Sequence, residues 1–244
     1  MRCVPLLNGK YWIALIGASI FGTNTGDFVS DYLGFGHLRG IPILLALLAA
    51  IFVAEKIVPW KSVAWFWAAI ITVRTFATNV ADSFFDHGIP YNRSIPIVAA
   101  LLLIAVIVQI ARKSPRADAD RPARADAQYW LSMSLAGILG TLCGDYTSFA
   151  RHMGTFDSTL LWSAGVMIMF VIWRPAKLGP ALLYWATVVL IRSAGTAAGD
   201  HVAETLGLGA ATALTGVLFV GLIAMIYGVR QEKLVGGVSA AAER

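Results

Sequence analysis

The chain has 244 residues, of which 58% are hydrophobic and 14% are charged, and its mean hydropathy is +0.71. A soluble domain carries about 25% charged residues, so this composition indicates an integral membrane protein. The formal net charge is +5, but no RNA- or DNA-binding motif accompanies it, and we expect no nucleic-acid partner. Two cysteines, Cys3 and Cys143, do not suggest a disulfide framework.

Eight apolar runs are long enough to cross a lipid bilayer, which takes about 17 to 25 residues. They cover residues 11–34, 40–56, 65–87, 95–111, 129–152, 157–173, 182–206 and 209–229. The sequence therefore predicts an all-α integral membrane protein with eight transmembrane helices. The first ten residues lack the features of a cleavable signal peptide, so we expect the first run to remain as a membrane helix.

Basic residues are distributed unequally between the two sides of the predicted membrane. The loops on the side of the N-terminus hold 14 Lys or Arg residues, whereas those on the other side hold Arg39, Arg93 and Arg151. Because basic loops stay in the cytoplasm, both termini are expected to be cytoplasmic. The Arg-, Asp-, Ala- and Pro-rich segment 112–128 is predicted to be a solvated cytoplasmic linker, and residues 231–244 a disordered tail.

Four of the runs share one motif, in which an aromatic residue and Trp precede two small residues, a Thr and an Asp. Its acidic segments are Gly22–Asp27, Ala77–Asp82, Gly140–Asp145 and Gly195–Asp200. Its tryptophans are Trp12, Trp67, Trp130 and Trp185, and in every copy the Asp follows the Trp by 15 residues. This spacing predicts four repeats of two helices each, all running through the membrane in the same direction.

A second period of 118 residues relates repeat one to repeat three and repeat two to repeat four. Repeats two and four share an arginine seven residues after the Trp, Arg74 and Arg192, where the other two repeats have a small residue. The order is therefore A-B-A-B, in two tandem halves at 1–111 and 129–230. Parallel halves related by an axis along the membrane normal are a known transporter plan.

This pattern resembles an uncharacterised family of bacterial membrane-anchored proteins built from four tandem repeats, each with two membrane helices and a conserved Trp. The resemblance extends from Tyr11 to about Arg230 and rests on the tryptophans, the Gly-Thr-x-x-Gly-Asp segments and Arg192. It implies the eight-helix repeat fold in a bacterial inner membrane, and it implies no established biochemical function. The second repeat departs from the pattern, with Ala77 and Ala81 in place of glycines.

The first helix of each repeat carries polar residues four apart, which places them on one broad face. These residues are Thr23, Asp27 and Asp31; Thr78, Asp82 and Asp86; Thr141 and Asp145; and Thr196, Asp200 and Glu204. Phe149 replaces the last acid in repeat three. A charge at mid-bilayer costs about 2.5–3.5 kcal/mol, so we expect these acids to face the interior of the helix bundle or a water-filled cavity. By their position, Arg74 and Arg192 lie nearer the cytoplasm than the acids.

Several acids near one axis need bound protons or a cation to offset their repulsion. We therefore expect a secondary transporter that binds a small cation and is not an enzyme. The central ligands or proton carriers would be Asp27, Asp82, Asp145 and Asp200, assisted by Thr23, Thr78, Thr141, Thr196, Asn24 and Asn79. The outer mouth or a gate would be formed by Asp31, Asp86, Glu204, Arg74 and Arg192.

Hard oxygen ligands suit magnesium, calcium or manganese, so a divalent metal is one candidate for the bound cation. His87 and His201 lie beside the acidic stripes and would add affinity for manganese or zinc. The expected partners are the lipid bilayer and a small ion or small molecule. Nothing in the sequence indicates an oligomeric state.

Three other interpretations remain open from the sequence. Arg74 and Arg192 could bind an organic or anionic substrate while the acids carry protons, or the arginines could pair with Asp residues of neighbouring helices. The acids could instead form a structural network in an accessory membrane protein. A membrane hydrolase is disfavoured because no nucleophile–base motif is present. The small-residue pairs predict close helix packing, and the tryptophans are expected to anchor the chain at the membrane interface.

Overall fold

The computed structural model describes residues 1, 3–59, 62–112, 125–173 and 180–228. Within these residues the secondary structure is helical, with eight α-helices and three π-helical segments that each follow an α-helix directly. Most of the predicted linker and all of the predicted tail lie outside the described residues. The helical fold agrees with the all-α prediction.

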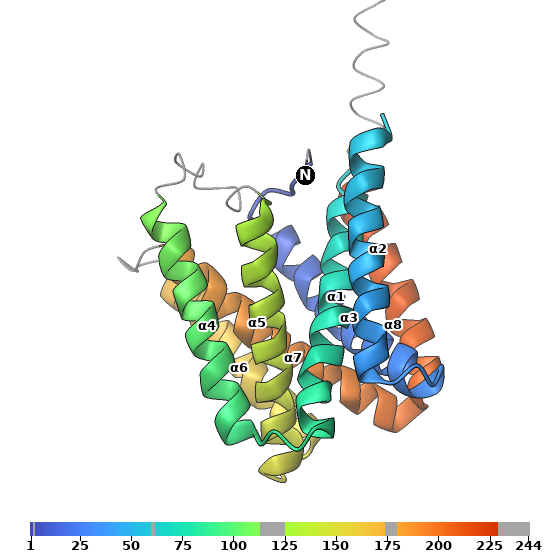
Figure 1. Ribbon diagram of the computed structural model, residues 1–244, viewed down its shortest axis with the longest axis vertical. Helices are drawn as coiled ribbons and strands as arrows, with labels where there is room; N and C mark the ends of the chain where they lie inside the picture. The colour runs from blue at the N-terminus through green and yellow to red at the C-terminus, as the bar shows by residue number, and fades with distance from the viewer. Residues whose placement is uncertain (2, 60–61, 113–124, 174–179, 229–244) are drawn as a thin grey trace, which may run out of the picture.

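The first helices of the four repeats form an inner ring. They are α1 (Gly9–Asp27), α3 (Ala64–Asp86), α5 (Ala127–Asp145) and α7 (Pro180–Leu206). Each inner helix packs against the next one, and α7 packs against α1, so the four helices close on themselves. The N-terminus lies at the end of the molecule where α3 and α5 begin (Figure 1), as expected for repeats that run in one direction.

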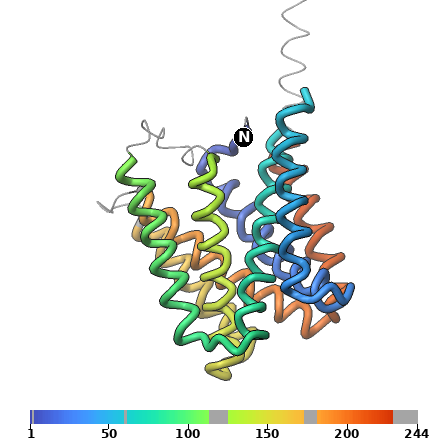
Figure 2. The backbone as a smooth tube through the Cα atoms, viewed as in Figure 1, coloured from blue at the N-terminus to red at the C-terminus, as the bar shows by residue number. Residues whose placement is uncertain are grey.

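The second helices of the repeats lie outside this ring. They are α2 (His37–Ile57), α4 (Tyr91–Ala111), α6 (Thr155–Trp173) and α8 (Leu208–Ile223). Each outer helix packs mainly on the inner helix of the following repeat: α2 on α3, α4 on α5, α6 on α7, and α8 on α1. Figure 2 shows α2 beside α3 and α4 beside α5. Neighbouring repeats are therefore interlocked around the whole ring.

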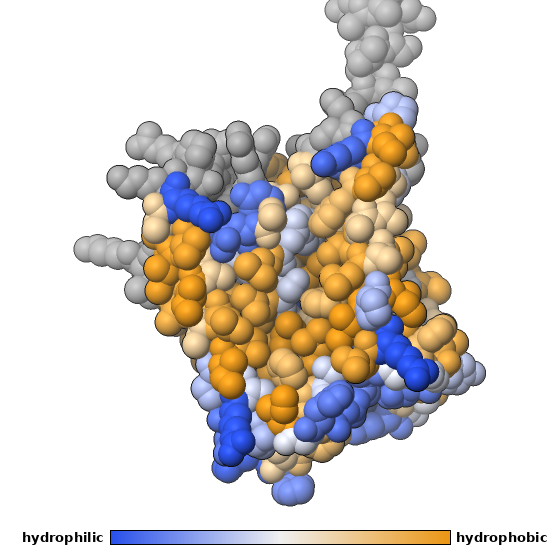
Figure 3. Space-filling view, in the orientation of Figure 1, coloured by the Kyte–Doolittle hydropathy of each residue, from blue (hydrophilic) through white to orange (hydrophobic). Residues whose placement is uncertain are grey.

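The outer helices present apolar side chains to their surroundings, as in Val217 of α8, which is 71% exposed. Within the described residues, five helices are long and apolar enough to cross a membrane, namely α2, α4, α6, α7, and α8 with its π-helical extension. A broad apolar surface lies between more hydrophilic ends in Figure 3. These features agree with a multi-pass helical membrane protein.

The backbone alternates between the two kinds of repeat. Helices α1 and α5 continue as π-helical segments, η1 (Phe28–Tyr32) and η2 (Tyr146–Ala150), directly after their repeat aspartates. Helices α3 and α7 remain α-helical beyond theirs. A π-helical turn widens the helix and redirects the side chains that follow it. The A-B-A-B order of the sequence thus reappears in the main chain.

A glycine with positive φ lies in each turn between the inner and outer helix of a repeat. These glycines are Gly36, Gly88, Gly154 and Gly207, with φ between 69° and 80°. Side chains with a Cβ rarely adopt this conformation, so glycine is required at the turn. The same sharp connection recurs in all four repeats and returns the chain along the ring.

The aromatic pairs that open the repeats are buried, and the expectation that the tryptophans anchor the chain at the membrane interface is wrong. All four tryptophans are at most 8% exposed. The aromatic residue before each Trp contacts the Trp of the next repeat, with ring centroids 5.6–5.8 Å apart. The pairs are Tyr11 with Trp67, Phe66 with Trp130, Tyr129 with Trp185, and Tyr184 with Trp12. Large planar side chains in this arrangement fill the end of the ring and keep water out.

Glycines set the spacing between the inner helices, as the small-residue pairs predicted. Gly22 lies against the Cβ and Cγ of Arg74, and Gly140 lies against the Cβ of Arg192, so neither position has room for a Cβ of its own. The second glycines of these pairs lie against the Thr of the next repeat in the same way. Such close contacts let the arginine and threonine side chains reach the ring interior.

Candidate functional site

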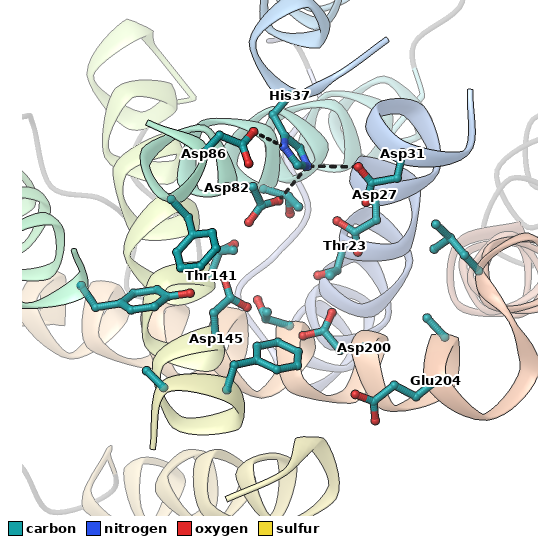
Figure 4. A pocket seen from close by; sticks show the side chains of 18 residues that line it. Thr23, Asp27, Asp31, His37, Asp82, Asp86, Thr141, Asp145, Asp200 and Glu204 are labelled. Atoms are coloured by element: carbon teal, nitrogen blue, oxygen red, sulfur yellow. Dashed lines mark hydrogen bonds and ion pairs between the residues drawn. The ribbon is translucent and has the colours of Figure 1, made fainter. Parts of the chain in front are cut away.

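A cavity of about 670 Å³ lies within the ring, at the end where the inner helices finish (Figure 4). All four inner helices contribute to its wall, together with residues at the starts of α2, α4 and α8. The carboxylates on its wall are Asp27, Asp31, Asp82, Asp86, Asp145, Asp200 and Glu204. The four threonines of the repeat stripes, Thr23, Thr78, Thr141 and Thr196, also line it. The structure therefore brings together every acid that the stripes predicted.

The cavity opens at the end farthest from the tryptophans. The side chains of Asp31 and Asp86 are 60% and 49% exposed, which places both acids at the mouth, as expected from the sequence. The threonines at the deep end are at most 1% exposed. A solute therefore reaches the repeat aspartates from one side only in this structure.

One arginine lies behind the threonines at the deep end of the cavity. The buried guanidinium of Arg74 donates from Nη1 to Thr141 Oγ1, and from Nη2 to Thr23 Oγ1 and Thr196 Oγ1, the last two at 2.5 Å. Its Nε donates to the carbonyl oxygen of Ser19 at 3.4 Å. Arg74 thus joins α3 to the three other inner helices. We call Arg74 with Thr23, Thr141 and Thr196 the arginine collar.

The arginines do not pair with aspartates, so this alternative is wrong. Among the ion pairs between described residues, none includes Arg74 or Arg192. Along a helix the threonines lie about 6 Å beyond the arginine position and the aspartates about 12 Å beyond it, so the guanidinium meets the hydroxyls first. Neither arginine is part of the cavity wall.

Arg192 occupies the repeat position of Arg74 but points the other way along the ring axis. Its Nη2 lies 3.5 Å from the sulfur of Met133, three residues after a repeat Trp, and the side chain is fully buried. Its Nε and Nη1 have no hydrogen-bond partner in the structure. Burying a guanidinium whose donors are unpaired raises the free energy of the folded state, so Arg192 is expected to destabilise the fold.

Three tyrosine hydroxyls meet at the aromatic end of the ring. Tyr11 lies 2.5 Å from Tyr184 and 3.4 Å from Tyr129, and Tyr129 lies 3.2 Å from Tyr184, measured between hydroxyl oxygens. Repeat two has Phe66 at this position and supplies no hydroxyl. The tyrosine triad, Arg192 and the arginine collar together block the axis between the cavity and the aromatic end.

His37 is a cavity residue that the sequence pattern missed. Its Nδ1 lies 2.7 Å from Asp86 Oδ2, and its Nε2 lies 3.5 Å from Asp31 Oδ1 and 3.7 Å from Asp82 Oδ2 (Figure 4). His37 begins α2, which packs on α3 and so reaches acids of two repeats. The available signal was its place directly after the turn glycine Gly36.

The two asparagines predicted as ligands lie outside the cavity wall. Asn24 donates from Nδ2 to Thr215 Oγ1 of α8 at 3.4 Å, and Asn79 donates from Nδ2 to the Thr75 carbonyl at 3.0 Å. Each asparagine follows a stripe threonine by one residue, which turns it about 100° away from the polar face. The bond of Asn24 joins α1 to α8, and the bond of Asn79 to Thr75 lies within α3.

The two histidines predicted as metal ligands also lie outside the cavity wall. His87 Nδ1 lies 2.7 Å from the Ser83 carbonyl oxygen, and His201 Nδ1 lies 3.2 Å from Thr155 Oγ1. Thr155 also donates to Glu204 Oε2 at 2.5 Å. In the described part of the chain, no group of three or more His, Cys, Asp or Glu side chains is arranged to hold a metal ion.

Two polar atoms on the cavity wall have no partner within the protein. Thr78 Oγ1 is buried without a hydrogen bond, because Arg74 lies on the same helix and bonds the threonines of the other three. Asp200 Oδ2 is also buried without a partner. Buried polar atoms are nearly always hydrogen-bonded, so unpaired ones on a cavity wall indicate a ligand or water.

A comparison with protein families finds the repeat in two places. The family described as Repeat of Unknown Function (DUF347) matches residues 10–58 and 183–232. The first segment covers α1 and α2, and the second covers most of α7 and all of α8, so the match coincides with repeats one and four. No curated protein and no solved structure matches the chain. The chain is therefore similar to an uncharacterised tandem-repeat family.

Proposed function

We propose that the protein is an eight-span carrier of a bacterial inner membrane that binds a small cationic solute in its acidic cavity. The observation that carries this proposal is that aspartates at one repeat position, from four different helices, line a single cavity that is open at one end and closed at the other. Several uncompensated carboxylates in one enclosed space favour bound protons or a bound cation.

The helix arrangement supports eight spans. The polar faces of α1, α3 and α5 line the cavity inside the ring, so they need not meet lipid. The surplus of basic loops on the side of the N-terminus favours cytoplasmic termini. In this orientation the aromatic end faces the cytoplasm and the cavity opens to the outside.

The charges on the wall favour a cation over an anion. Seven carboxylates line the cavity, and His37 is the one basic side chain among the lining residues. Arg74 is held by hydroxyls and Arg192 lies deeper, so neither is available to an anion at the wall. These contacts disfavour the alternative of an anionic substrate bound by the arginines.

A carrier is favoured over an open channel because the ring axis is blocked. Passage of a solute from the cavity to the aromatic end requires the arginine collar to release at least one of its threonines and the tyrosine triad to separate. Transporters built from repeats expose a central site to either side of the membrane by rocking one half against the other. Carboxylates that release a proton when the solute binds would couple transport of the solute to transport of protons.

Binding of cations to the purified protein tests this proposal. We expect calorimetry with a panel of K⁺, Mn²⁺, methylammonium and 2-phenylethylammonium to find at least one ligand whose affinity falls about tenfold or more in Asp82→Asn and Asp200→Asn. Asp157→Asn is the matched control, because Asp157 lies in the first turn of α6, outside the cavity wall. Cation binding that is the same in the wild type and in all four repeat Asp→Asn variants would contradict the proposal.

Transport itself is tested in proteoliposomes that contain the same variants. We expect the cation that binds to be taken up by vesicles with the wild-type protein and with Asp157→Asn, and not by vesicles with Asp200→Asn. Uptake that continues in Asp200→Asn would show that the solute crosses by another route.

A further inference from the structure

The size of the cavity bears on the class of solute. Its volume of about 670 Å³ falls within the roughly 300–1,000 Å³ typical of small-molecule sites. A bare metal ion is instead held by oxygens at about 2.0–2.6 Å, and the described residues contain no group arranged to hold one. The space therefore fits an organic molecule.

The wall of the cavity is aromatic on the side between α3 and α5. Phe149 stands at the repeat position that holds an acid in the other three repeats, and Phe85 and Tyr91 line the cavity with it. Tyr91 contacts Phe85 at a ring-centroid distance of 6.0 Å and Tyr146 at 5.9 Å. Phe85 and Phe149 are 65% and 49% exposed, so both rings are available to a solute.

Carboxylates line the cavity on every side, since each of the four inner helices contributes its repeat aspartate. Asp31 comes from η1 and Glu204 from α7, two elements that lie across the ring from the α3–α5 contact. Deeper in the cavity, Thr78 Oγ1 and Asp200 Oδ2 lack partners. Carboxylate oxygens accept hydrogen bonds, and a hydroxyl can also accept one, so these atoms match the N–H donors of an ammonium group.

We infer that the cavity takes a protonated amine that carries an apolar or aromatic group. The ammonium group lies among Asp27, Asp82, Asp145 and Asp200, and the apolar group lies against the aromatic wall of Phe85, Tyr91 and Phe149. Carboxylates hold the charge by direct attraction, and aromatic faces attract both a cation and another ring. This inference rests on the proposed cation-binding function and adds the chemical class of the solute.

Calorimetry with two amines on the full-length protein tests the inference. Both 2-phenylethylammonium and methylammonium carry one positive charge, but only the first has an aromatic group. We expect 2-phenylethylammonium to bind the wild type about tenfold more tightly or better, and Phe149→Ala to remove most of that difference without changing the affinity for methylammonium. Phe156→Ala is the matched control, because Phe156 is an exposed aromatic residue of α6 outside the cavity wall.

A second variant reverses the preference. Phe149→Asp places at this position the kind of acidic side chain that the other three repeats have. We expect it to strengthen methylammonium binding and to make methylammonium bind at least as tightly as 2-phenylethylammonium. Thermal unfolding of each variant confirms that it is folded before binding is compared. Both variants remove the aromatic ring, but a general loss of structure cannot strengthen methylammonium binding in Phe149→Asp.

The outcomes separate this inference from the proposed function. Equal affinities for the two amines in wild type and Phe149→Ala would overturn the inference and leave cation binding intact. Binding of K⁺ or Mn²⁺ that depends on Asp200, with no binding of either amine, would also overturn it while supporting the cation site. Absence of any cation binding that depends on the four repeat aspartates would overturn both.

Discussion

Gly137 of α5 lies directly against Ala77 of α3, so close that a Cβ on Gly137 would come within 2.7 Å of the Ala77 Cβ. At the other three contacts between inner helices, a glycine of one repeat faces a larger side chain of the next. At this contact the first repeat position holds Ala77 and the glycine, Gly137, lies on the following repeat, so one of the two helices still presents a glycine to the other. The alanine that departs from the repeat pattern is thus matched by a glycine across the contact.

Gly137→Ala should therefore lower the apparent unfolding temperature, because the added methyl has no room. Overpacking of this kind costs about 1–3 kcal/mol. The double variant with Ala77→Gly should recover most of the loss, and thermal unfolding in detergent measures both. Gly221→Ala is the control, since no atom lies within 4 Å of a Cβ at that exposed position of α8. A double variant as unstable as Gly137→Ala would show that Ala77 and Gly137 do not compensate for each other across this contact.

The two buried arginines should respond differently to the same substitution. Arg74→Met removes hydrogen bonds to three helices, so we expect a loss of about 3 kcal/mol or more in stability. Arg192→Met removes a charge with unpaired donors, so we expect stability to stay within about 1 kcal/mol or to rise. Thermal unfolding of the two purified variants makes the comparison. Equal losses would mean that the contacts of Arg192 stabilise the protein as much as the arginine collar does.

Substitution of a stripe threonine should affect stability only where the threonine accepts a hydrogen bond from Arg74. Thr196→Val removes an acceptor of a charged donor, and we expect it to destabilise the protein by about 1.5–3 kcal/mol. Thr78→Val replaces a hydroxyl that has no partner, so stability should hold while cation affinity falls. Thermal unfolding and calorimetry on both variants check the division. Loss of stability in Thr78→Val would show that its hydroxyl has a structural partner.

Interlocked repeats predict that the two halves of the chain depend on each other. Helix α4 packs on α5 and α8 packs on α1, so each half covers the other. Segments 1–112 and 125–244, expressed together as separate chains, should co-purify in detergent through an affinity tag on one of them. Each segment expressed alone should aggregate, because α1 and α5 then lose their covering helices. A monodisperse single half would contradict this prediction.

Much of the architecture was predictable because the repeats share one register. The 15-residue spacing from Trp to Asp put equivalent residues at equal depth, so four aspartates on polar helix faces had to meet once the helices formed a ring. The cost of charge in lipid left no other place for them. The sequence also predicted the A-B-A-B order. The inner helices follow the same order, because α1 and α5 end in π-helical segments and α3 and α7 end as α-helices.

The sequence predictions that were incomplete or wrong concern side chains whose contacts depend on how other helices pack around them. The sequence pattern does not predict His37 as a cavity residue, because its contacts depend on which inner helix α2 packs against. The direction of the turn at Gly36 sets that packing. The tryptophans were expected at the membrane interface, but the ring closes so tightly that their side chains lie inside it. The asparagines lie outside the cavity wall because one residue of offset turns a side chain away from the polar face.

The position of Arg74 limits how this ring can be assembled. A side chain that reaches all three other inner helices from one of them must occupy the centre, and the centre has room for one guanidinium among those hydroxyls. Two identical half-length chains paired around a twofold axis would each supply such an arginine and would have to treat both alike. Two halves of different sequence, here joined in one chain, can send one arginine toward the threonines and its counterpart toward Met133. Divergence between the two halves of one chain therefore lets different side chains surround the ring axis at positions that identical repeats would make the same.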